Sequence, residues 1–241
     1  MLPEHYNYIV QSYLYASLST ALASRLHDEG WEFGKRRFKM FVFSQLYAQQ
    51  LQRTAHPMDA PGQPSQPRVN LGSPCWFLVG SPEEQILQEL AQSLLHSGEG
   101  RLGSNAVRVT SVALLAPLQL EPGPIQTLRV RTLSPITVYK TDERRHTVYF
   151  SPHDAAFSAY IRENARRKFT AYTGREPDVS GFDIRPLDQR DHAVTVIFKG
   201  TRIRGHTGRF ELSGSGELLR FLYDAGLGSK NSEGCGMIEI E

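Results

Sequence analysis

Hydrophobic and polar residues along the chain follow two periods, and each change of period marks a new element. Apolar residues at helical spacing predict a helix over residues 3–26, with Pro3 in its first turn. Alternation then predicts a strand over residues 35–44, and a Pro-, Gln- and Gly-rich stretch predicts a loop over residues 53–67. A strand at 75–79, a helix capped by Ser81 with Pro82 in its first turn, and a strand at about 105–116 follow.

The second half of the chain repeats a similar order of elements. After a boundary from Pro117 to Pro124, the pattern predicts a strand at 126–133, a hairpin at 137–150 and a helix from Ser151 to about residue 173. Strands near 181–187 and 193–212, a helix at 217–225 and a tail strand complete it. We therefore expect an α+β fold of two tandem ferredoxin-like (split βαβ) domains, residues 1–118 and 124–241. The first strand of the first domain is missing from this pattern, because the chain opens on a helix.

Composition and charge narrow the function classes. The chain has 241 residues, of which 40% are hydrophobic and 22% charged, as in a globular protein. A net charge of +2 means that a nucleic-acid role must depend on local clusters. No apolar run approaches the roughly 20 residues of a membrane helix. The two cysteines, Cys75 and Cys235, have no metal-ligand spacing, so we expect no metal or cofactor. Two cysteines also cannot make a disulfide framework, so we expect a reducing, cytoplasmic setting.

Basic residues gather in two places that suit phosphate binding. One cluster lies on the strand at 35–44, where Arg37, Lys39, Phe41 and Phe43 are predicted to share a face that could stack bases. A solvated edge strand is the alternative. The other cluster lies on the helix that ends near residue 173, and a solvated charged face is the alternative for both. The candidate phosphate contacts are Lys35, Arg36, Arg37, Arg162, Arg166, Arg167 and Lys168.

A glycine-rich stretch follows the last predicted helix. Exposed N–H groups of such a loop can hold phosphates, although a long turn that only closes the fold is equally compatible. The order helix, glycine loop, strand is the reverse of a P-loop, which argues against nucleotide binding of the Walker type. The candidate binding residues in this stretch are Gly226, Gly228, Lys230, Asn231, Ser232, Gly234 and Gly236.

Blocks at both ends of the chain resemble a known family. The glycine-rich stretch is similar to the C-terminal loop of the RAMP superfamily. Leu2-Pro3, Tyr6-Asn7-Tyr8, Gln11-Ser12 and Tyr15, then residues 26–30 and 38–44, resemble the CRISPR-associated endoribonucleases that cut precursor CRISPR RNA within its repeats. That family usually has a strand before the Leu-Pro helix.

The resemblance implies metal-independent cleavage. The ribose 2′-hydroxyl would attack the adjacent phosphate and leave a 2′,3′-cyclic phosphate and a 5′-hydroxyl. By position in the motifs, the family's catalytic tyrosine, histidine and lysine match Tyr15, His27 and Lys39. His27 is then the main acid/base, Tyr15 orients the nucleophile or assists as base, and Lys39 stabilises negative charge on the phosphate.

Two other functions remain open from the sequence. The same fold could be a non-catalytic RNA-binding subunit of a CRISPR effector complex, or a scaffold that binds proteins through exposed edges. Repeat RNA is the expected partner, and effector-complex subunits are further candidates. No membrane partner is expected. The sequence leaves the oligomeric state open, with a homodimer among the options.

Overall fold

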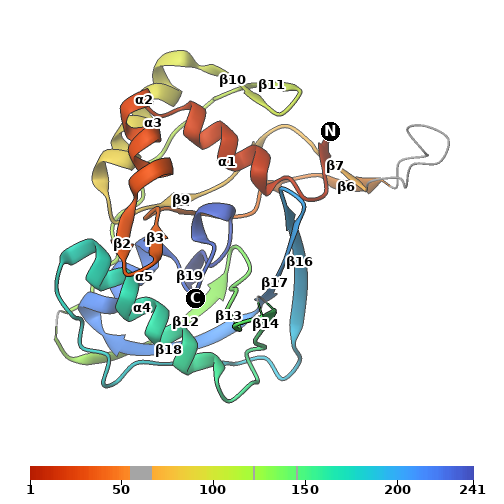
Figure 1. The fold of residues 1–241 in the computed structure, drawn as a ribbon. Helices are drawn as coiled ribbons and strands as arrows, with labels where there is room; N and C mark the ends of the chain where they lie inside the picture. The colour runs from red at the N-terminus through yellow and green to blue at the C-terminus, as the bar shows by residue number, and fades with distance from the viewer. Residues whose placement is uncertain (55–66, 122, 145) are drawn as a thin grey trace.

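The computed structural model describes residues 1–54, 67–121, 123–144 and 146–241 (Figure 1). It is a mixed α+β fold in which every strand pair among these residues is antiparallel. No helix in the described residues is both long and apolar enough to cross a membrane.

The C-terminal half is built on one four-stranded sheet with the spatial order β15-β18-β12-β19. In chain order its elements are β12 (Ile125–Thr132), α4 (Phe157–Thr173), β15 (Asp183–Pro186), β18 (Arg209–Ser215), α5 (Gly216–Ala225) and β19 (Ile238–Ile240). This is the split βαβ arrangement that the sequence predicts for this half. Two hairpins are inserted, β13 (Tyr139–Thr141) with β14 (Thr147–Tyr149), and β16 (His192–Phe198) with β17 (Thr201–Thr207). The core lies between the sheet and its helices, where Val130 and Leu212 join Ile161 and Leu222 in one cluster.

The N-terminal half is organised differently, around a long, interrupted hairpin. Its first arm holds β4 (Val42–Phe43), β5 (Tyr47–Ala48) and β6 (Leu51–Thr54), and its second arm holds β7 (Arg68–Leu71), β8 (Cys75–Trp76) and β9 (Val79–Gly80). The other elements are β1 (Leu2–Pro3), α1 (Asn7–Ala16), α2 (Thr20–Ser24), the hairpin of β2 (Trp31–Phe33) and β3 (Arg36–Phe38), α3 (Glu84–Ser97) and the hairpin of β10 (Glu99–Leu102) and β11 (Asn105–Arg108). No four-stranded sheet forms here among the described residues, so the tandem repeat and its boundary stay predictions.

Several predicted elements of this half are wrong in extent. Residues 3–26 form two helices, because α1 ends at Ala16 and Ser19 starts α2 by accepting a hydrogen bond from the Leu22 N–H. Pro3 lies in β1, which pairs with β7, so a short strand does precede the helix. The predicted strand at 105–116 stops at Arg108.

Other predicted strands, a helix cap and a loop also differ from the structure. The strand at 35–44 is broken at Met40, whose φ of 51° is outside the β region. Phe41 and Phe43 are consequently buried in the N-terminal core and cannot form a base-stacking face. Ser81 does not cap α3; its Oγ donates to the Met40 carbonyl at 2.6 Å. Residues 193–212 form parts of three strands, β16, β17 and β18. Most of the predicted loop at 53–67 lies outside the described residues, while its first residues belong to β6.

Hairpin β2–β3 connects the two halves. Trp31 and Phe38, which face each other across this hairpin, pack against the hydrophobic core of the C-terminal half. The Arg166 guanidinium of α4 lies 5.3 Å from the centre of the Phe33 ring. Figure 1 shows the hairpin between α2 above and α4 below. A segment of the N-terminal half is thereby fixed against α4.

Candidate functional site

His27 lies on an unusual turn directly after α2. Residues Arg25–Glu29 form one π-helical turn, closed by a hydrogen bond from the Gly30 N–H to the Arg25 carbonyl at 2.8 Å. Single π turns occur frequently at functional sites. Gly30 has φ +61°, and a Cβ there would lie 2.6 Å from the Phe38 carbonyl oxygen. Only glycine therefore allows β3 to pack this closely against the turn.

The His27 side chain is 78% exposed and has one partner among the residues that the structure describes. Its Nδ1 lies 2.7 Å from Asp28 Oδ1, which favours a proton on Nδ1. In the neutral ring Nε2 then carries the lone pair, and no described residue is hydrogen-bonded to Nε2. The imidazole is therefore oriented by the protein and accessible to a substrate.

Lys39 and Arg37 hold the backbone of this turn. Lys39 Nζ donates to the His27 carbonyl at 2.5 Å, and Arg37 Nη1 donates to the Asp28 carbonyl at 2.7 Å. Burial lowers the pKa of Lys39, and the nearby Arg37 charge lowers it further. An ammonium has three N–H donors, so Lys39 can hold the turn and still donate to a phosphate oxygen. The structure thus brings His27 and Lys39 together.

Tyr15 lies on α1 and packs against Phe41, in the segment that follows Lys39. Its ring meets Phe41 edge-on, with 5.8 Å between the ring centres, and Phe41 follows Lys39 by two residues. Burial raises the pKa of Tyr15 to about 12. At neutral pH this phenol is therefore a hydrogen-bond donor and a poor base, which agrees with an orienting role.

The glycine-rich loop (residues 226–236) is mainly buried and is held by side chains from two helices, α4 and α1. Lys168 of α4 is 1% exposed and donates to the Gly226 carbonyl (2.7 Å), the Gly228 carbonyl (3.2 Å) and Asn231 Oδ1 (2.6 Å). From α1, Asn7 donates to the Glu233 and Gly234 carbonyls and Gln11 donates to the Ser232 carbonyl. All four glycines have positive φ. The loop therefore joins α1 to α4.

Only part of this loop is accessible to a ligand. The predicted residues Gly226, Gly228, Gly234 and Gly236 are buried, whereas residues 229–233 are half-buried. Lys230 pairs with Glu233 at 2.9 Å. Sequence reasoning did not assign roles to Asn7, Gln11 or Lys168 in this loop, although Asn7 and Gln11 are within the blocks that carry the resemblance. In a run of basic residues along a helix, the sequence does not show which lysine is buried.

The other basic candidates divide into free and paired side chains. Lys35, Arg36 and Arg162 are exposed, and their side chains make no hydrogen bond or ion pair with any residue that the structure describes. Arg166 is paired with Glu163 (2.9 Å) and Glu176 (2.7 Å), and Arg167 is paired with Glu163 (2.5 Å). The Arg166 guanidinium is thus occupied by these carboxylates and by the Phe33 ring, while the side chains of Lys35, Arg36 and Arg162 are available to an anionic ligand.

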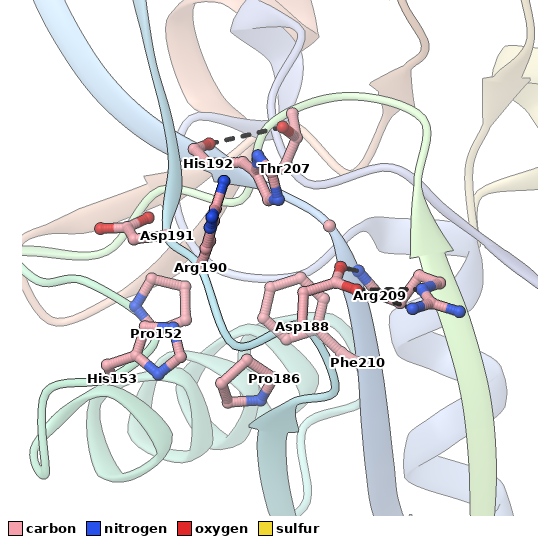
Figure 2. A pocket seen from close by; sticks show the side chains of 11 residues that line it. Pro152, His153, Pro186, Asp188, Arg190, Asp191, His192, Thr207, Arg209 and Phe210 are labelled. Carbon is pink, nitrogen blue, oxygen red and sulfur yellow. Dashed lines mark hydrogen bonds and ion pairs between the residues drawn. The ribbon is translucent and has the colours of Figure 1, made fainter.

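A hollow between β15, β17 and β18 contains none of these candidates. Figure 2 shows Asp188 paired with Arg209, and the Thr207 hydroxyl bonded to the His192 carbonyl. Its volume is about 10 Å³, which is room for about one water molecule. In the part of the chain that the structure describes, no three His, Cys, Asp or Glu side chains are placed to hold a metal ion.

The sequence of the C-terminal half decides the family. The sequence model described as "CRISPR associated protein Cas6, C-terminal" matches residues 120–240, which is half of the chain. The chain belongs to the Cas6 family. The matched residues include the four-stranded sheet, both of its helices and the glycine-rich loop. His27, Tyr15 and Lys39 lie outside them.

Known Cas6 proteins resemble the whole chain. The "CRISPR-associated endoribonuclease Cas6 1" of Methanocaldococcus jannaschii is 24% identical over 99% of this chain and 87% of its own length. A solved Cas6-related protein of Pyrococcus furiosus has a TM-score of 0.79 at 20% identity, covering 100% of this chain and 92% of that one. A structure described as "An RAMP protein binding different RNA substrates" has a TM-score of 0.75 at 23% identity, covering 100% and 93%. The Cas6-type RAMP fold therefore extends over both halves.

Proposed function

We propose that this protein is a metal-independent endoribonuclease that cleaves precursor CRISPR RNA within its repeats. The observation that carries the proposal is the contact between the His27 turn and Lys39. The Lys39 ammonium donates to the backbone carbonyl of His27, and the His27 imidazole on the same turn is accessible and oriented by Asp28. Relatives named endoribonucleases, and a relative described as an RNA-binding RAMP protein, support the same substrate class.

In the proposed reaction the ribose 2′-hydroxyl attacks the adjacent phosphorus, and the bond from phosphorus to the 5′-oxygen breaks. His27 accepts the 2′-hydroxyl proton at Nε2, and the imidazolium so formed gives a proton to the leaving 5′-oxygen. Lys39 stabilises the charge that develops on the non-bridging oxygens. Tyr15 donates a hydrogen bond that orients the ribose. The products are a 2′,3′-cyclic phosphate and a 5′-hydroxyl.

A second candidate function is RNA binding without cleavage, as a RAMP-type subunit of an effector complex. The observation that favours it is the position of Tyr15, whose ring packs on Phe41 and makes no hydrogen bond or ring contact with His27 or Lys39. Lys39 also has a structural partner in the His27 carbonyl.

The test is incubation of the purified chain with its host's repeat RNA in EDTA, followed by mapping of the product ends. We expect one cut, a cyclic phosphate and a 5′-hydroxyl. A cut that EDTA abolishes would contradict the metal-independent mechanism. Tight binding with no cut would support the second function.

A further inference from the structure

A cavity of about 300 Å³ lies between strand β13 and helix α4, with Arg36 of β3 at its edge, and none of its lining residues belongs to the His27 turn. This volume is at the small end of the roughly 300–1,000 Å³ found for ligand pockets. Its walls come from β3, β13, α4 and the start of the glycine-rich loop. The side chains that matter here are Arg36, Tyr139, Lys140, Tyr160, Arg167 and Ser229.

The cavity is positively charged. Arg36 and Lys140 are exposed, and their side chains have no hydrogen bond or ion pair within the part of the chain that is described. Arg167 uses its Nε for Glu163, and its terminal nitrogens are not used in that bond. Three cations and the single carboxylate of Glu163 line the space. Such a set favours a phosphate or another anion.

Two aromatic rings on the cavity wall are held by neighbours. Tyr160 stacks on Phe150, with 4.5 Å between ring centres and 26° between planes. Tyr139 lies 5.6 Å from Tyr149. Rings fixed in this way can stack with a base at low entropic cost, since their rotamers are already restricted. Beside them the Ser229 hydroxyl offers a polar contact for a base edge.

The two faces of hairpin β2–β3 separate this cavity from the His27 turn. Arg36 is paired across the hairpin with Phe33, whose ring packs under Arg166 of α4. Arg37 lies on the opposite face and binds the Asp28 carbonyl. A single RNA strand that reaches both places must therefore cross the tip of the hairpin, where Gly34 and Lys35 are exposed.

We propose that this cavity binds one unpaired nucleotide of the RNA, with its base against Tyr160 or Tyr139 and its phosphate between Arg36 and Lys140. This inference rests on the proposed RNA substrate. The cavity would add a contact to one RNA base to the contacts that the basic side chains make with the RNA phosphates. The protein should therefore prefer RNA whose unpaired segment is long enough to extend past the tip of the protein hairpin β2–β3.

The experiment is a double-mutant cycle on the full chain. Repeat RNAs that each lack one base are bound to the wild type and to Tyr160→Leu and Tyr139→Leu, and the dissociation constants are measured by filter binding. In the wild type we expect one unpaired position where loss of the base weakens binding by about 5- to 150-fold. In one of the two variants that penalty should disappear, while Tyr160→Phe and Tyr139→Phe should retain it.

Controls separate this inference from the proposed function. Arg36→Ala should weaken binding of every RNA, whereas Arg108→Ala, a matched loss of charge on β11, should not. Each variant's thermal midpoint is compared with that of the wild type, and a tetranucleotide RNA carrying 2-aminopurine reports stacking directly by quenching. Cleavage with neither a coupled position nor quenching would overturn the nucleotide site alone. Quenching that requires Tyr160 or Tyr139, without repeat cleavage, would overturn the proposed enzyme and keep the site.

Discussion

The His27 turn and the glycine-rich loop are both closed by glycines, but they are held in opposite ways. The His27 side chain is 78% exposed, and two cations fix only the backbone around it. The loop is packed between helices, and the Lys168 side chain that binds it is 1% exposed. The two regions therefore have different roles in the structure. The turn presents the His27 side chain to solvent, and the loop holds the two halves of the protein together.

Replacing His27 is the sharpest way to break this comparison. His27→Ala should slow single-turnover cleavage by about 10²- to 10⁴-fold, because an acid/base group is lost, and should leave RNA binding and the thermal midpoint unchanged. His146→Ala is the matched control. His146 is 74% exposed and its Nδ1 lies 3.5 Å from Asp142 Oδ2, but it belongs to hairpin β13–β14, away from the His27 turn in the chain. Undiminished cleavage by His27→Ala would remove His27 from the site.

Lys168→Met should have the reverse effect, on stability. Methionine is also unbranched, but it is one atom shorter and leaves the Gly226 and Gly228 carbonyls and Asn231 Oδ1 without their donor. We expect a loss of about 3 kcal/mol in the free energy of unfolding, or a midpoint roughly 6–12 °C lower. Arg162→Met, on the exposed face of the same helix, should change stability by less than about 0.5 kcal/mol. Equal midpoints for the two variants would show that the loop does not depend on Lys168.

Gly234→Ala tests the close packing of the loop. Gly234 has φ +80°, and a Cβ would lie 2.4 Å from Asn7 Nδ2 and 2.6 Å from the Phe43 ring. Gly174, at the end of α4, has φ +75° and open space around it, so Gly174→Ala carries only the backbone strain of about 1–2 kcal/mol. We expect Gly234→Ala to cost about 1–3 kcal/mol more in chemical denaturation. Similar values would mean that the two halves can move apart locally.

Tyr15→Phe should have the smallest effect. A lost hydrogen bond of about 0.5–1.5 kcal/mol lowers the cleavage rate by about tenfold or less. Because burial raises the pKa of Tyr15 to about 12, the phenol stays protonated between about pH 6 and pH 9. The pH–rate profile should therefore keep its shape in this variant. Loss of an alkaline limb from the profile would instead identify Tyr15 as a base.

The burial of Tyr15 also predicts a pH dependence of stability. Its pKa is raised from 10.0 to about 12 in the native state, so the unfolded chain loses this proton first. The contribution to stability is complete below about pH 10 and falls as the pH rises toward 12. In Tyr15→Phe this part of the alkaline decline should be missing from denaturation curves.

The sequence predicts the C-terminal half better than the N-terminal half. Hairpin 137–150, helix α5 and strand β19 form where the pattern places them, because each has a regular period and a clear stop signal. Helix α4 ends at Thr173 as predicted, but it begins at Phe157 and not at Ser151, and its N-cap is Ala156. The N-terminal pattern misleads at Met40, where one positive φ turns the chain and buries Phe41 and Phe43. A period cannot reveal such a break, because tertiary packing stabilises it.

The candidate site shows the same limit. Motif positions suggest Tyr15, His27 and Lys39, and the structure joins His27 to Lys39 through a backbone carbonyl, a contact that side-chain types do not encode. Lys168 looks like one more surface cation in the run from Arg162, yet it is buried. The cavity at Tyr160 needs side chains from both halves of the chain, so no local pattern points to it.

Asn231 has a consequence for how the sequences of relatives can vary. Its amide donates to the Leu227 and Cys235 carbonyls, and its oxygen accepts from Lys168. Both of its N–H donors and its acceptor are therefore committed. An aspartate at this position would put a carboxylate oxygen against those two carbonyls, and a shorter side chain would leave Lys168 without one acceptor. We expect substitutions at Asn231 and Lys168 to occur together in an alignment, even though the two residues are on different elements and far apart in the chain.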